Sequence, residues 1–425
     1  MKLRISTDEL SGRISAIASK SHLHRLLIVS AFSSSPCKII CNHSTGEDIL
    51  ATIDCLKSLG ATITTLTNGY EVLPIDRNNL PQKAILPCRE SGSTLRFMLP
   101  IVCALGIDGE FHCEGRLPQR PLAPLDNLLR EKGCTIQAFQ HGVLRCFGKL
   151  SAGKYSIAGN ISSQYITGLL FALSLLYKDS QLQITGKVES LNYIYMTLDA
   201  LKQFGHNIPT ENYLYTIYGG KPFIAPLNVK VQGDWSNSAF WLTAGAMSKS
   251  GITLTGLQMD SLQGDKEIIT ILKNMGADIL ICGDDITVKK NRLQGIRLEA
   301  EKIPDLVPIV AALASICNGE SIISKASRLR LKESDRIKAV AEALQALGAT
   351  LKTQEDGFII QGKSQLQTGT CDSCNDHRIA MMCAIISGAC ESDIIINDAQ
   401  SVNKSYPNFW ADLVILGKKV EVVHE

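Results

Sequence analysis

The chain has 425 residues, which is too long for one ordinary domain and predicts two or three. Its composition, 45% hydrophobic and 20% charged, is typical of a globular protein with a large core, and 43 basic against 41 acidic residues leave a net charge of +2 that does not favour nucleic acid or an anionic membrane as a partner. The alternating N-terminal segment lacks the apolar core of a signal peptide, and no apolar run approaches the ~18 to 20 residues that span a bilayer.

One short phrase recurs along the whole chain at intervals of about 70 residues. A leucine is followed four residues later by a glycine and then by strand-forming residues, at Gly60, Gly133, Gly205, Gly276, Gly348 and Gly417. Each phrase is typical of a helix that ends in a C′ glycine before a strand. The sequence therefore predicts six α/β units, each with two helices and several strands.

A second periodicity marks the starts of apolar helices. Short polar residues precede them at Ser19, Ser91, Ser162, Ser236, Asp305 and Asp376. Helices that are apolar on most faces are buried, and their N-termini combine free N–H groups with the positive end of the helix dipole. We expect these helix starts to meet in a common cleft. Taken alone, each is equally typical of an ordinary N-cap.

The first three helix starts carry most of the cations and hydroxyls of the N-terminal half. Lys20 and Ser21 stand at the tip of the first, with Arg25 one turn on. In the second, Gly92 lets backbone N–H groups approach a ligand. The remaining candidates in this half are Arg96, Arg120 in a proline-stiffened loop, Ser162, Ser163, Gln164 and Ser190, whose side chains suit phosphate or sugar hydroxyls. The fourth start, around Ser236, has no cation and is expected to be mainly structural.

The C-terminal half supplies the candidate acid–base residues. Asp305 opens the fifth apolar helix and is a candidate general base. In the stretch 330–336, Lys332 and Glu333 precede an amphipathic helix that Ser334 or Asp335 caps, with Arg336 in its first turn. The cations of this half are Lys332, Arg336, Arg378 and Lys404, and those of the first half are Lys20, Arg25, Arg96 and Arg120. Eight such charges in one cleft would need highly anionic ligands, and two phosphorylated, carboxylated substrates would fit.

These spaced motifs together resemble the 5-enolpyruvylshikimate-3-phosphate synthase (3-phosphoshikimate 1-carboxyvinyltransferase) family from end to end. The resemblance implies a two-lobed inside-out α/β barrel of six βαβαββ units, three per lobe, with a hinge between the lobes. The C-terminal lobe would comprise residues 1–18 and 232–425, completed by the N-terminal strand, and the N-terminal lobe residues 19–231.

The resemblance also implies the reaction and its site. The enolpyruvyl group of phosphoenolpyruvate would pass to the 5-hydroxyl of shikimate 3-phosphate, with release of phosphate, by addition and elimination through a tetrahedral intermediate, without cofactor or metal, in chorismate and aromatic amino-acid biosynthesis. Shikimate 3-phosphate would be held by Lys20, Ser21, Arg25, Ser162, Ser163, Gln164, Ser190, Asp305 and Lys332. Phosphoenolpyruvate would be held by Lys20, Gly92, Arg120, Gln164, Arg336, Arg378 and Lys404. Asp305, Glu333 and Lys20 would be catalytic, and glyphosate would compete with phosphoenolpyruvate.

Two positions depart from the family's commonest pattern: Glu90 and Arg328 stand where Asn is frequent. Glu90 bears on the phosphoenolpyruvate loop and on glyphosate sensitivity. The nearest alternative is the sister transferase that acts on UDP-N-acetylglucosamine, which usually carries a reactive Cys where this chain has Gly115; Cys113 lies two residues away. A non-catalytic anion-binding scaffold would not need Asp305 and Glu333, and a nucleic-acid-binding module would need a basic face.

The 14 cysteines lie mostly within apolar runs, which is typical of buried free thiols and predicts a cytoplasmic protein. Cys371, Cys374 and His377 have the residue types of a metal site, but no second ligand pair has the right spacing, so we predict no metal. The protein is expected to act as a monomer.

Overall fold

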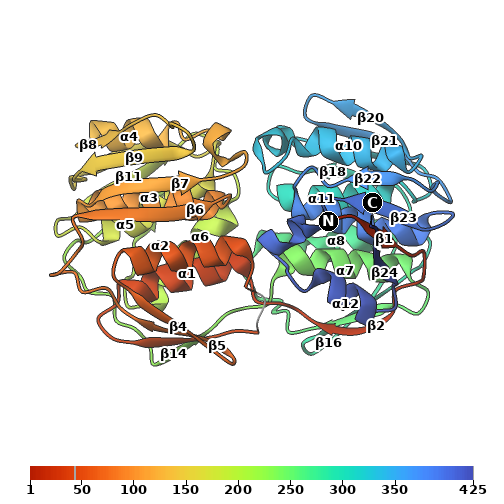
Figure 1. The fold of residues 1–425 in the computed structure, drawn as a ribbon, viewed down its shortest axis with the longest axis horizontal. Helices are drawn as coiled ribbons and strands as arrows, with labels where there is room; N and C mark the ends of the chain where they lie inside the picture. The colour runs from red at the N-terminus through yellow and green to blue at the C-terminus, as the bar shows by residue number, and fades with distance from the viewer. Residues whose placement is uncertain (43–44, 425) are drawn as a thin grey trace. The chain divides into compact units, whose positions relative to one another are not determined.

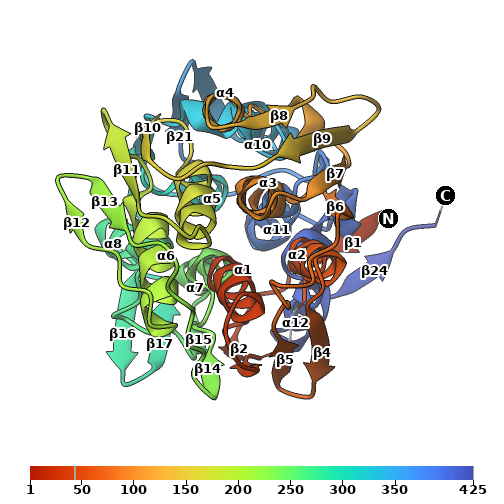
Figure 2. The same ribbon diagram turned by 90° about the vertical axis from the view of Figure 1, so that its left-hand side faces the viewer.

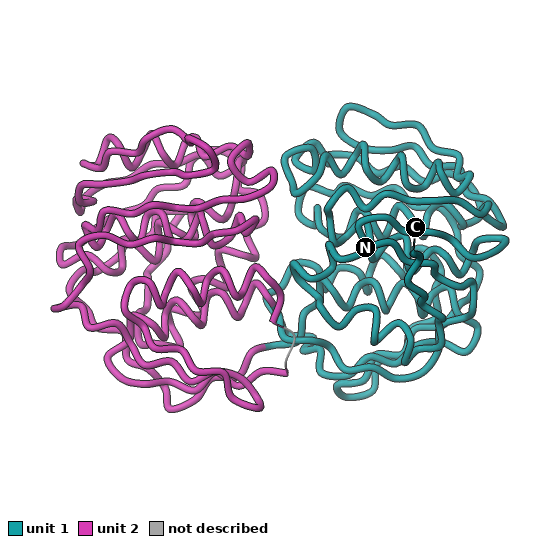
Figure 3. The backbone as a smooth tube through the Cα atoms, viewed as in Figure 1, with its two compact units in different colours: residues 1–19, 232–425 teal, residues 20–231 magenta. Residues whose placement is uncertain are grey.

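The computed structural model describes residues 1–42 and 45–424. Its α/β chain divides into two compact units, unit 1 (Met1–Ser19 with Gln232–Glu425) and unit 2 (Lys20–Val231), which Figure 3 shows in two colours. Ser19, expected at the start of the N-terminal lobe, belongs instead to unit 1. Its N–H donates to Gln232 O at 2.8 Å and its hydroxyl donates to Gln263 Oε1 at 2.9 Å, and both partners are residues of unit 1.

The strands of the described residues form six four-stranded sheets that share one pairing pattern. In each sheet a parallel pair of strands is followed by two antiparallel neighbours. The sheets of unit 2 are β14 (Asn228–Lys230)–β3 (Cys37–Ile40)–β5 (Gly69–Leu73)–β4 (Thr62–Leu66), β6 (Lys83–Arg89)–β7 (Asp108–Cys113)–β9 (Val143–Gly148)–β8 (Cys134–Ile136) and β10 (Lys154–Ala158)–β11 (Ser180–Thr185)–β13 (Leu214–Ile217)–β12 (Thr210–Glu211).

The sheets of unit 1 include both strands that precede Ser19. They are β2 (Gly12–Ser15)–β15 (Ile252–Thr255)–β17 (Asp285–Lys289)–β16 (Asp278–Cys282), β18 (Arg297–Glu299)–β19 (Glu320–Ser324)–β21 (Gly357–Gln361)–β20 (Thr350–Gln354) and β22 (Thr370–Asp372)–β23 (Ile394–Asn397)–β1 (Leu3–Ile5)–β24 (Val420–Val422). In the last sheet β1 lies between β23 and β24, with Leu3 opposite both Ile396 and Val422 (Figure 1).

Three almost wholly buried helices lie at the centre of unit 2, with its sheets around them (Figure 2). They are α1 (Lys20–Ala31), α3 (Gly92–Leu105) and α5 (Ser163–Ser174). Most residues of each helix are buried, as expected for helices that are apolar on most faces. The other helices of the unit are α2 (Glu47–Ser58), α4 (Leu125–Glu131), α6 (Leu191–Gln203) and the short 3-10 helix η1 (Leu117–Gln119).

Unit 1 has a corresponding set of buried helices that pack on one another: α7 (Trp235–Met247), α9 (Val307–Ala314) and α11 (His377–Ile386). The remaining helices are α8 (Ile268–Asn274), α10 (Arg336–Ala346) and α12 (Phe409–Ile415), with 3-10 helices η2 (Gly264–Glu267), η3 (Pro304–Leu306), η4 (Ser327–Leu331), η5 (Ser387–Ala389) and η6 (Ala399–Lys404). Among the described residues, none of the helices combines the length and the apolar character that crossing a membrane requires.

The predicted helix ends are confirmed at all six glycines. Each one follows the last residues of α2, α4, α6, α8, α10 or α12 and has a positive φ, between 74° at Gly348 and 115° at Gly417. Glycine adopts this left-handed conformation without the steric cost of a Cβ. The chain therefore leaves each helix sharply and enters a strand within a few residues.

The predicted helix starts are confirmed at five of the six positions and wrong at Ser236. Ser19 directly precedes α1, which begins at Lys20. The side chains of Ser91, Ser162 and Asp376 cap α3, α5 and α11. Ser236 lies inside α7, because Asp234 is the N-cap and accepts the Asn237 N–H at 2.7 Å. Asp305 lies in η3, which runs directly into the apolar helix α9, and its carboxylate contacts cationic side chains.

Candidate active site

Arg25 is a buried cation of unit 2 whose hydrogen-bond partners are all neutral. Its guanidinium donates to the backbone oxygens of Ser21 (2.6 Å) and Tyr193 (2.9 Å) and to the hydroxyl of Thr197 (2.9 Å), and only 2% of the residue is exposed. Burial lowers the pKa of Arg25 to about 10. In the part of the chain that the structure describes, no carboxylate pairs with Arg25. A buried charge without a counter-ion suits an anionic ligand.

Lys20 begins α1 and reaches the start of α2. Its Nζ lies 2.7 Å from Asp48 Oδ2, and both side chains are less than one-fifth exposed. Ser21, the next residue, holds Arg25 through its backbone oxygen. Lys20, Ser21 and Arg25 therefore lie together along the first turns of α1, as the sequence predicted.

Two guanidinium groups converge on the N-terminus of α3. A Cβ added to Gly92 would lie 2.5 Å from one terminal nitrogen of Arg96 and 2.8 Å from one of Arg120. Gln164, at the start of α5, accepts a hydrogen bond from Arg96 at 2.9 Å and donates one to Ser93 at 2.8 Å. Gly92, Arg96, Arg120 and Gln164 thus form one group in which cations and helix-terminal N–H groups can bind an anion.

The serines of unit 2 lie at two further helix starts. Ser162 caps α5 by accepting the Gln164 N–H, and Ser163 is the first residue of that helix. Ser190 precedes α6 in the left-handed conformation, with φ of 54°. Because α6 also provides the Tyr193 and Thr197 partners of Arg25, Ser190 lies at the end of the helix that holds this guanidinium.

In unit 1 the Asp305 carboxylate is surrounded by cations. Its Oδ1 lies 2.7 Å from a terminal nitrogen of Arg336, 3.2 Å from Lys332 Nζ and 3.6 Å from Arg378 Nε. Burial raises the pKa of Asp305, but Lys332, Arg378 and Arg336 outweigh burial and hold this pKa well below its usual range. Asp305 is therefore ionised, as a proton acceptor must be.

Arg336 is bound by three carboxylates and its side chain is only 1% exposed. Besides Asp305, it donates to Glu333 at 2.8 Å and to both oxygens of Asp376, at 2.8 and 3.2 Å. Burial lowers the pKa of Arg336, but Asp376, Glu333 and Asp305 more than offset burial, so that the pKa is raised. Asp376 also caps α11 and accepts a hydrogen bond from Ser334, which ties the loop before α10 to α11.

The other cations of unit 1 surround this cluster. Lys332 lies in the loop between η4 and α10, and burial lowers its pKa although Asp305 opposes the shift. Arg378 donates to Asp305 O at 3.2 Å and to Ser236 Oγ at 2.7 Å. Lys404, at the end of η6, donates to Asn375 O at 2.6 Å. Cys374 and Asn375 both have positive φ, which turns this oxygen toward Lys404.

The structure places the predicted residues in two groups, one in each unit. The unit 2 group contains Lys20, Ser21, Arg25, Gly92, Arg96, Arg120, Ser162, Ser163, Gln164 and Ser190, and the unit 1 group contains Asp305, Lys332, Glu333, Arg336, Arg378 and Lys404. Each group has four of the eight predicted cations. The unit 1 group also contains the two predicted acid–base residues, with Arg336 bonded to both.

Sequence reasoning missed three side chains that the geometry adds. Asp48 pairs with Lys20, Asp265 lies buried beside Asp305 and Arg378, and Ser236, expected to be structural, binds Arg378. The only available signal for Asp48 was its position in an acidic helix start, and none existed for Asp265.

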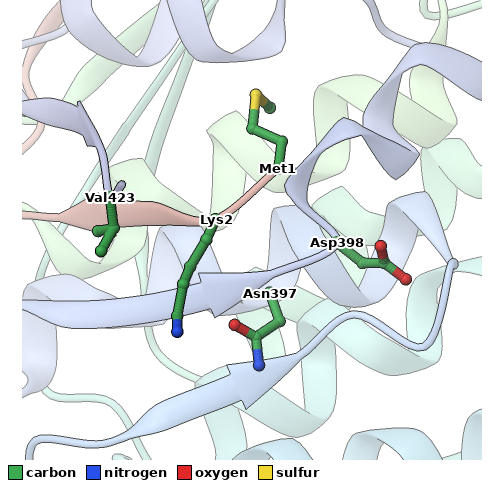
Figure 4. Close-up of a pocket in the computed structure, with 5 residues that line it drawn as sticks. All are labelled: Met1, Lys2, Asn397, Asp398 and Val423. Atoms are coloured by element: carbon green, nitrogen blue, oxygen red, sulfur yellow. The ribbon is translucent and has the colours of Figure 1, made fainter. Parts of the chain in front are cut away.

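Neither the metal-like residues nor the surface pocket adds to these groups. Within residues 1–42 and 45–424, no three His, Cys, Asp or Glu side chains are arranged to hold a metal ion. A pocket of about 340 Å³ in unit 1 is lined by Met1, Lys2, Asn397, Asp398 and Val423 (Figure 4), none of which is a predicted site residue.

Comparison with solved structures defines the class of fold. The chain is similar to EPSP synthase from Acinetobacter baumannii, with a TM-score of 0.81, 23% identity and full coverage of both chains. It is also similar to the enolpyruvyl transferase NikO from Streptomyces tendae, with a TM-score of 0.79 and 17% identity over 99% of this chain and 98% of that one. The α/β fold is therefore that of enolpyruvyl transferases, as the sequence predicted.

Comparison of sequences defines the family. The model of the EPSP synthase (3-phosphoshikimate 1-carboxyvinyltransferase) family matches residues 5–413. A 3-phosphoshikimate 1-carboxyvinyltransferase from Clostridium novyi is 42% identical over 98% of this chain and 97% of its own, and one from Clostridium kluyveri is 40% identical over the same shares. The chain belongs to the EPSP synthase family and is a transferase.

Proposed function

We propose that the protein transfers the enolpyruvyl group of phosphoenolpyruvate to the 5-hydroxyl of shikimate 3-phosphate and releases phosphate. The reaction is a step of chorismate and aromatic amino-acid biosynthesis. The observation that carries the proposal is the Asp305 carboxylate, held ionised among Lys332, Arg336 and Arg378 in a chain that belongs to the EPSP synthase family. A proton acceptor beside several cations is what addition of a hydroxyl to an anionic substrate requires.

The proposed site for shikimate 3-phosphate combines hydroxyl and cationic side chains. Arg25, buried among neutral partners, suits the substrate's charge, and the helix-start serines suit its phosphate and hydroxyl groups. The full set is Lys20, Ser21, Arg25, Ser162, Ser163, Gln164, Ser190, Asp305 and Lys332.

The proposed site for phosphoenolpyruvate consists of guanidinium and ammonium groups that suit its carboxylate and phosphate. The set is Lys20, Gly92, Arg120, Gln164, Arg336, Arg378 and Lys404. Arg120 lies at Gly92, where the free N–H groups of α3 begin. Arg336 and Arg378 both contact Asp305, so the donor substrate would be bound beside the base.

In the proposed first step the 5-hydroxyl oxygen bonds to C2 of phosphoenolpyruvate while Asp305 accepts the hydroxyl proton. C3 takes a proton from Glu333, which enters this step as the carboxylic acid, and this transfer completes the tetrahedral intermediate. In the second step Glu333 removes a C3 proton, and the bond between C2 and the phosphate oxygen breaks, which restores the double bond. The departing phosphate takes the proton that Asp305 accepted, so both side chains return to their starting protonation states. Lys20 would stabilise the charge that develops.

The pKa of Asp305 should also change when the substrate binds. Asp305 shares Arg336 and Arg378 with the anion that the site would bind. An anionic substrate that takes over these cations removes part of what lowers the pKa of Asp305, so the carboxylate becomes a stronger base when phosphoenolpyruvate is present. The pKa of the base would thereby depend on the substrate.

The sister reaction on UDP-N-acetylglucosamine is less well supported. Gly115 stands where that family usually has its cysteine, and it has a φ of 53°. A Cβ at this position would lie 2.5 Å from Glu90 Oε2. Both observations disfavour a side chain at residue 115.

The proposal is tested by phosphate release from phosphoenolpyruvate with either shikimate 3-phosphate or UDP-N-acetylglucosamine, alongside Asp305→Asn and Glu333→Gln. Turnover only with shikimate 3-phosphate, lost in both variants, is the expected result. Turnover only with the nucleotide sugar would assign the protein to the sister reaction. Absence of turnover with both substrates would leave an anion-binding scaffold.

Three further properties are part of the proposal. Glyphosate would inhibit by competing with phosphoenolpyruvate for the cations of its site, which inhibition kinetics at varied phosphoenolpyruvate would test. The protein would act as a monomer, which light scattering would test. Its 14 free cysteines, most of them buried, favour a reducing cytoplasm, which fractionation of the source cells would test.

A further inference from the structure

A buried carboxylate with no role in the proposed reaction lies next to the base. Asp265, in the 3-10 helix η2, is 2% exposed, and its electrostatic neighbours are Asp305 from η3, Arg378 from α11 and Asp234 from the turn before α7. Its side chain is hydrogen-bonded to Ser236 of α7. A buried carboxylate costs free energy unless it has partners, so its position calls for a physical reason.

The Ser236 hydroxyl connects Asp265 to Arg378. Arg378 donates to Ser236 Oγ at 2.7 Å. Because a hydroxyl has a single proton, an oxygen that accepts from Arg378 directs its own proton to another acceptor, and that acceptor is the Asp265 carboxylate. The hydrogen bonds therefore run in one direction, from Arg378 to Ser236 and from Ser236 to Asp265.

The backbone around Asp265 is itself held rigidly against α7. The side chain of Gln263 accepts the Trp235 N–H at 3.1 Å and the Ser19 hydroxyl at 2.9 Å, and it donates to Gly233 O at 2.8 Å. These bonds join the start of η2 to the start of α7. Asp265 and Ser236 are thus fixed relative to each other by bonds that involve neither of them.

We propose that Asp265 is a positioning residue, whose carboxylate orients the Ser236 hydroxyl and so fixes the Arg378 guanidinium beside Asp305 for the anion of the donor substrate. This inference rests on the proposed function, in which Arg378 binds phosphoenolpyruvate. Arg378 also donates to Asp305 O at 3.2 Å, so the same guanidinium links the positioning residue to the base. In this role Asp265 acts on Arg378 through the Ser236 hydroxyl.

The charge of Asp265 makes this role depend on pH. Burial and the charge of Asp305 raise the pKa of Asp265 to about 6, while Arg378 and Ser236 oppose the shift. Above this pH the carboxylate is ionised and accepts the Ser236 proton. Below it, the protonated group no longer holds the hydroxyl in one orientation. The effect of Asp265 on the position of Arg378 is therefore present above the pKa of Asp265 in the folded protein and is lost as the pH falls through this value.

The test compares kcat/KM for phosphoenolpyruvate between pH 5 and 8.5, at saturating shikimate 3-phosphate, in the wild-type protein and in Asp265→Asn. The ratio of the two values cancels the ionisation of the substrates. We expect kcat/KM of the wild type to exceed that of Asp265→Asn about tenfold at pH 8, mostly because the variant has a higher KM. The ratio should approach one near pH 5. Asp260→Asn makes the same change at an exposed position of the same segment and should match the wild type at every pH.

A double-mutant cycle tests whether Asp265 acts through Ser236. Ser236→Ala should lose about as much kcat/KM at pH 8 as Asp265→Asn, the double variant should lose no more than either, and Ser236→Thr should restore most of the activity. A pH-independent ratio, or additive losses in the double variant, would overturn the proposal.

Thermal unfolding supplies a readout that needs no turnover. At pH 8 the wild type must keep a charged carboxylate buried at residue 265, which lowers its stability, whereas Asn carries no charge. The Tm of Asp265→Asn relative to the wild type should therefore be higher at pH 8 than at pH 5. A Tm difference that does not change with pH would overturn the inference about Asp265. Absence of turnover by the wild type would refute the proposed function, while the Tm comparison would still decide the charge of Asp265.

Discussion

Replacing Asp305 with Asn should separate catalysis from anion binding. The carboxylate contacts Arg336, Lys332 and Arg378 at 2.7, 3.2 and 3.6 Å and competes with any anionic ligand for them. Asn has nearly the same shape, but it has no charge and cannot accept a proton. The variant therefore loses the base and, at the same time, releases three cations.

The two effects have opposite signs and different sizes. Loss of a general base lowers kcat by about 10² to 10⁴. A hydrogen bond to a charged group contributes about 1.5 to 3 kcal/mol. If one such bond to Asp305 no longer has to be exchanged, phosphoenolpyruvate or phosphate binds roughly 10- to 150-fold more tightly. Arg336 retains Glu333 and Asp376, so we expect the variant to fold.

Steady-state phosphate release gives kcat, and calorimetric titration with phosphoenolpyruvate gives Kd. Asp284→Asn, at an exposed position, is the matched control and should change neither. An unchanged kcat would show that Asp305 is not the base. A Kd that rises tenfold would show that the carboxylate supports the anion site rather than competing with the ligand, and would refute the electrostatic reasoning.

Three further predictions follow from the described contacts. Arg25→Lys should raise KM for shikimate 3-phosphate at least about tenfold, because an ammonium cannot keep the fork of bonds to Ser21, Thr197 and Tyr193, and kinetics with phosphoenolpyruvate saturating would show it. Gly92→Ala should raise KM for phosphoenolpyruvate by about tenfold and leave that for shikimate 3-phosphate within a factor of two, because its methyl group displaces the guanidiniums of Arg96 and Arg120; equal changes in both KM values would contradict this. Burial lowers the pKa of His206 to about 4, below the value near 6.5 in the unfolded chain. The free energy of unfolding should therefore be highest above pH 6.5 and fall by about 3 kcal/mol toward pH 4, and urea unfolding of His206→Phe should show a shallower decline.

Local sequence signals located the helix boundaries and the cations. The glycines were predictable because a C′ position needs a positive φ, which Gly348 and Gly417 adopt. Ser21 and Arg25 were predictable as neighbours because residues four apart lie on the same face of a helix. The start of α7 was placed two residues late, because both Asp234 and Ser236 are residues that cap helices, and only tertiary contacts decide between them.

The contacts between distant segments were not predictable from local pattern. Arg336 and Asp376 are 40 residues apart and meet because α10 and α11 pack on each other. Asp265 gave no signal, since an acidic residue after a glycine is ordinary at the surface, and only the packing of η2 on α7 buries it. Glu333 and Asp305 were named as an acid–base pair, but their shared partner Arg336 emerged only from the structure.

The position of β1 between β23 and β24 has a consequence for synthesis of the protein on the ribosome. Unit 2 is one continuous stretch of the chain, Lys20–Val231. The first strand leaves the ribosome before it but has no partners until residues 394–397 and 420–422 follow. At about 5 to 20 residues per second, this strand waits some 20 to 80 seconds with its backbone groups unpaired. Leu3 and Ile5 have no strand partners during that interval, so we expect this strand of the nascent chain to be a site of chaperone binding before the last sheet closes.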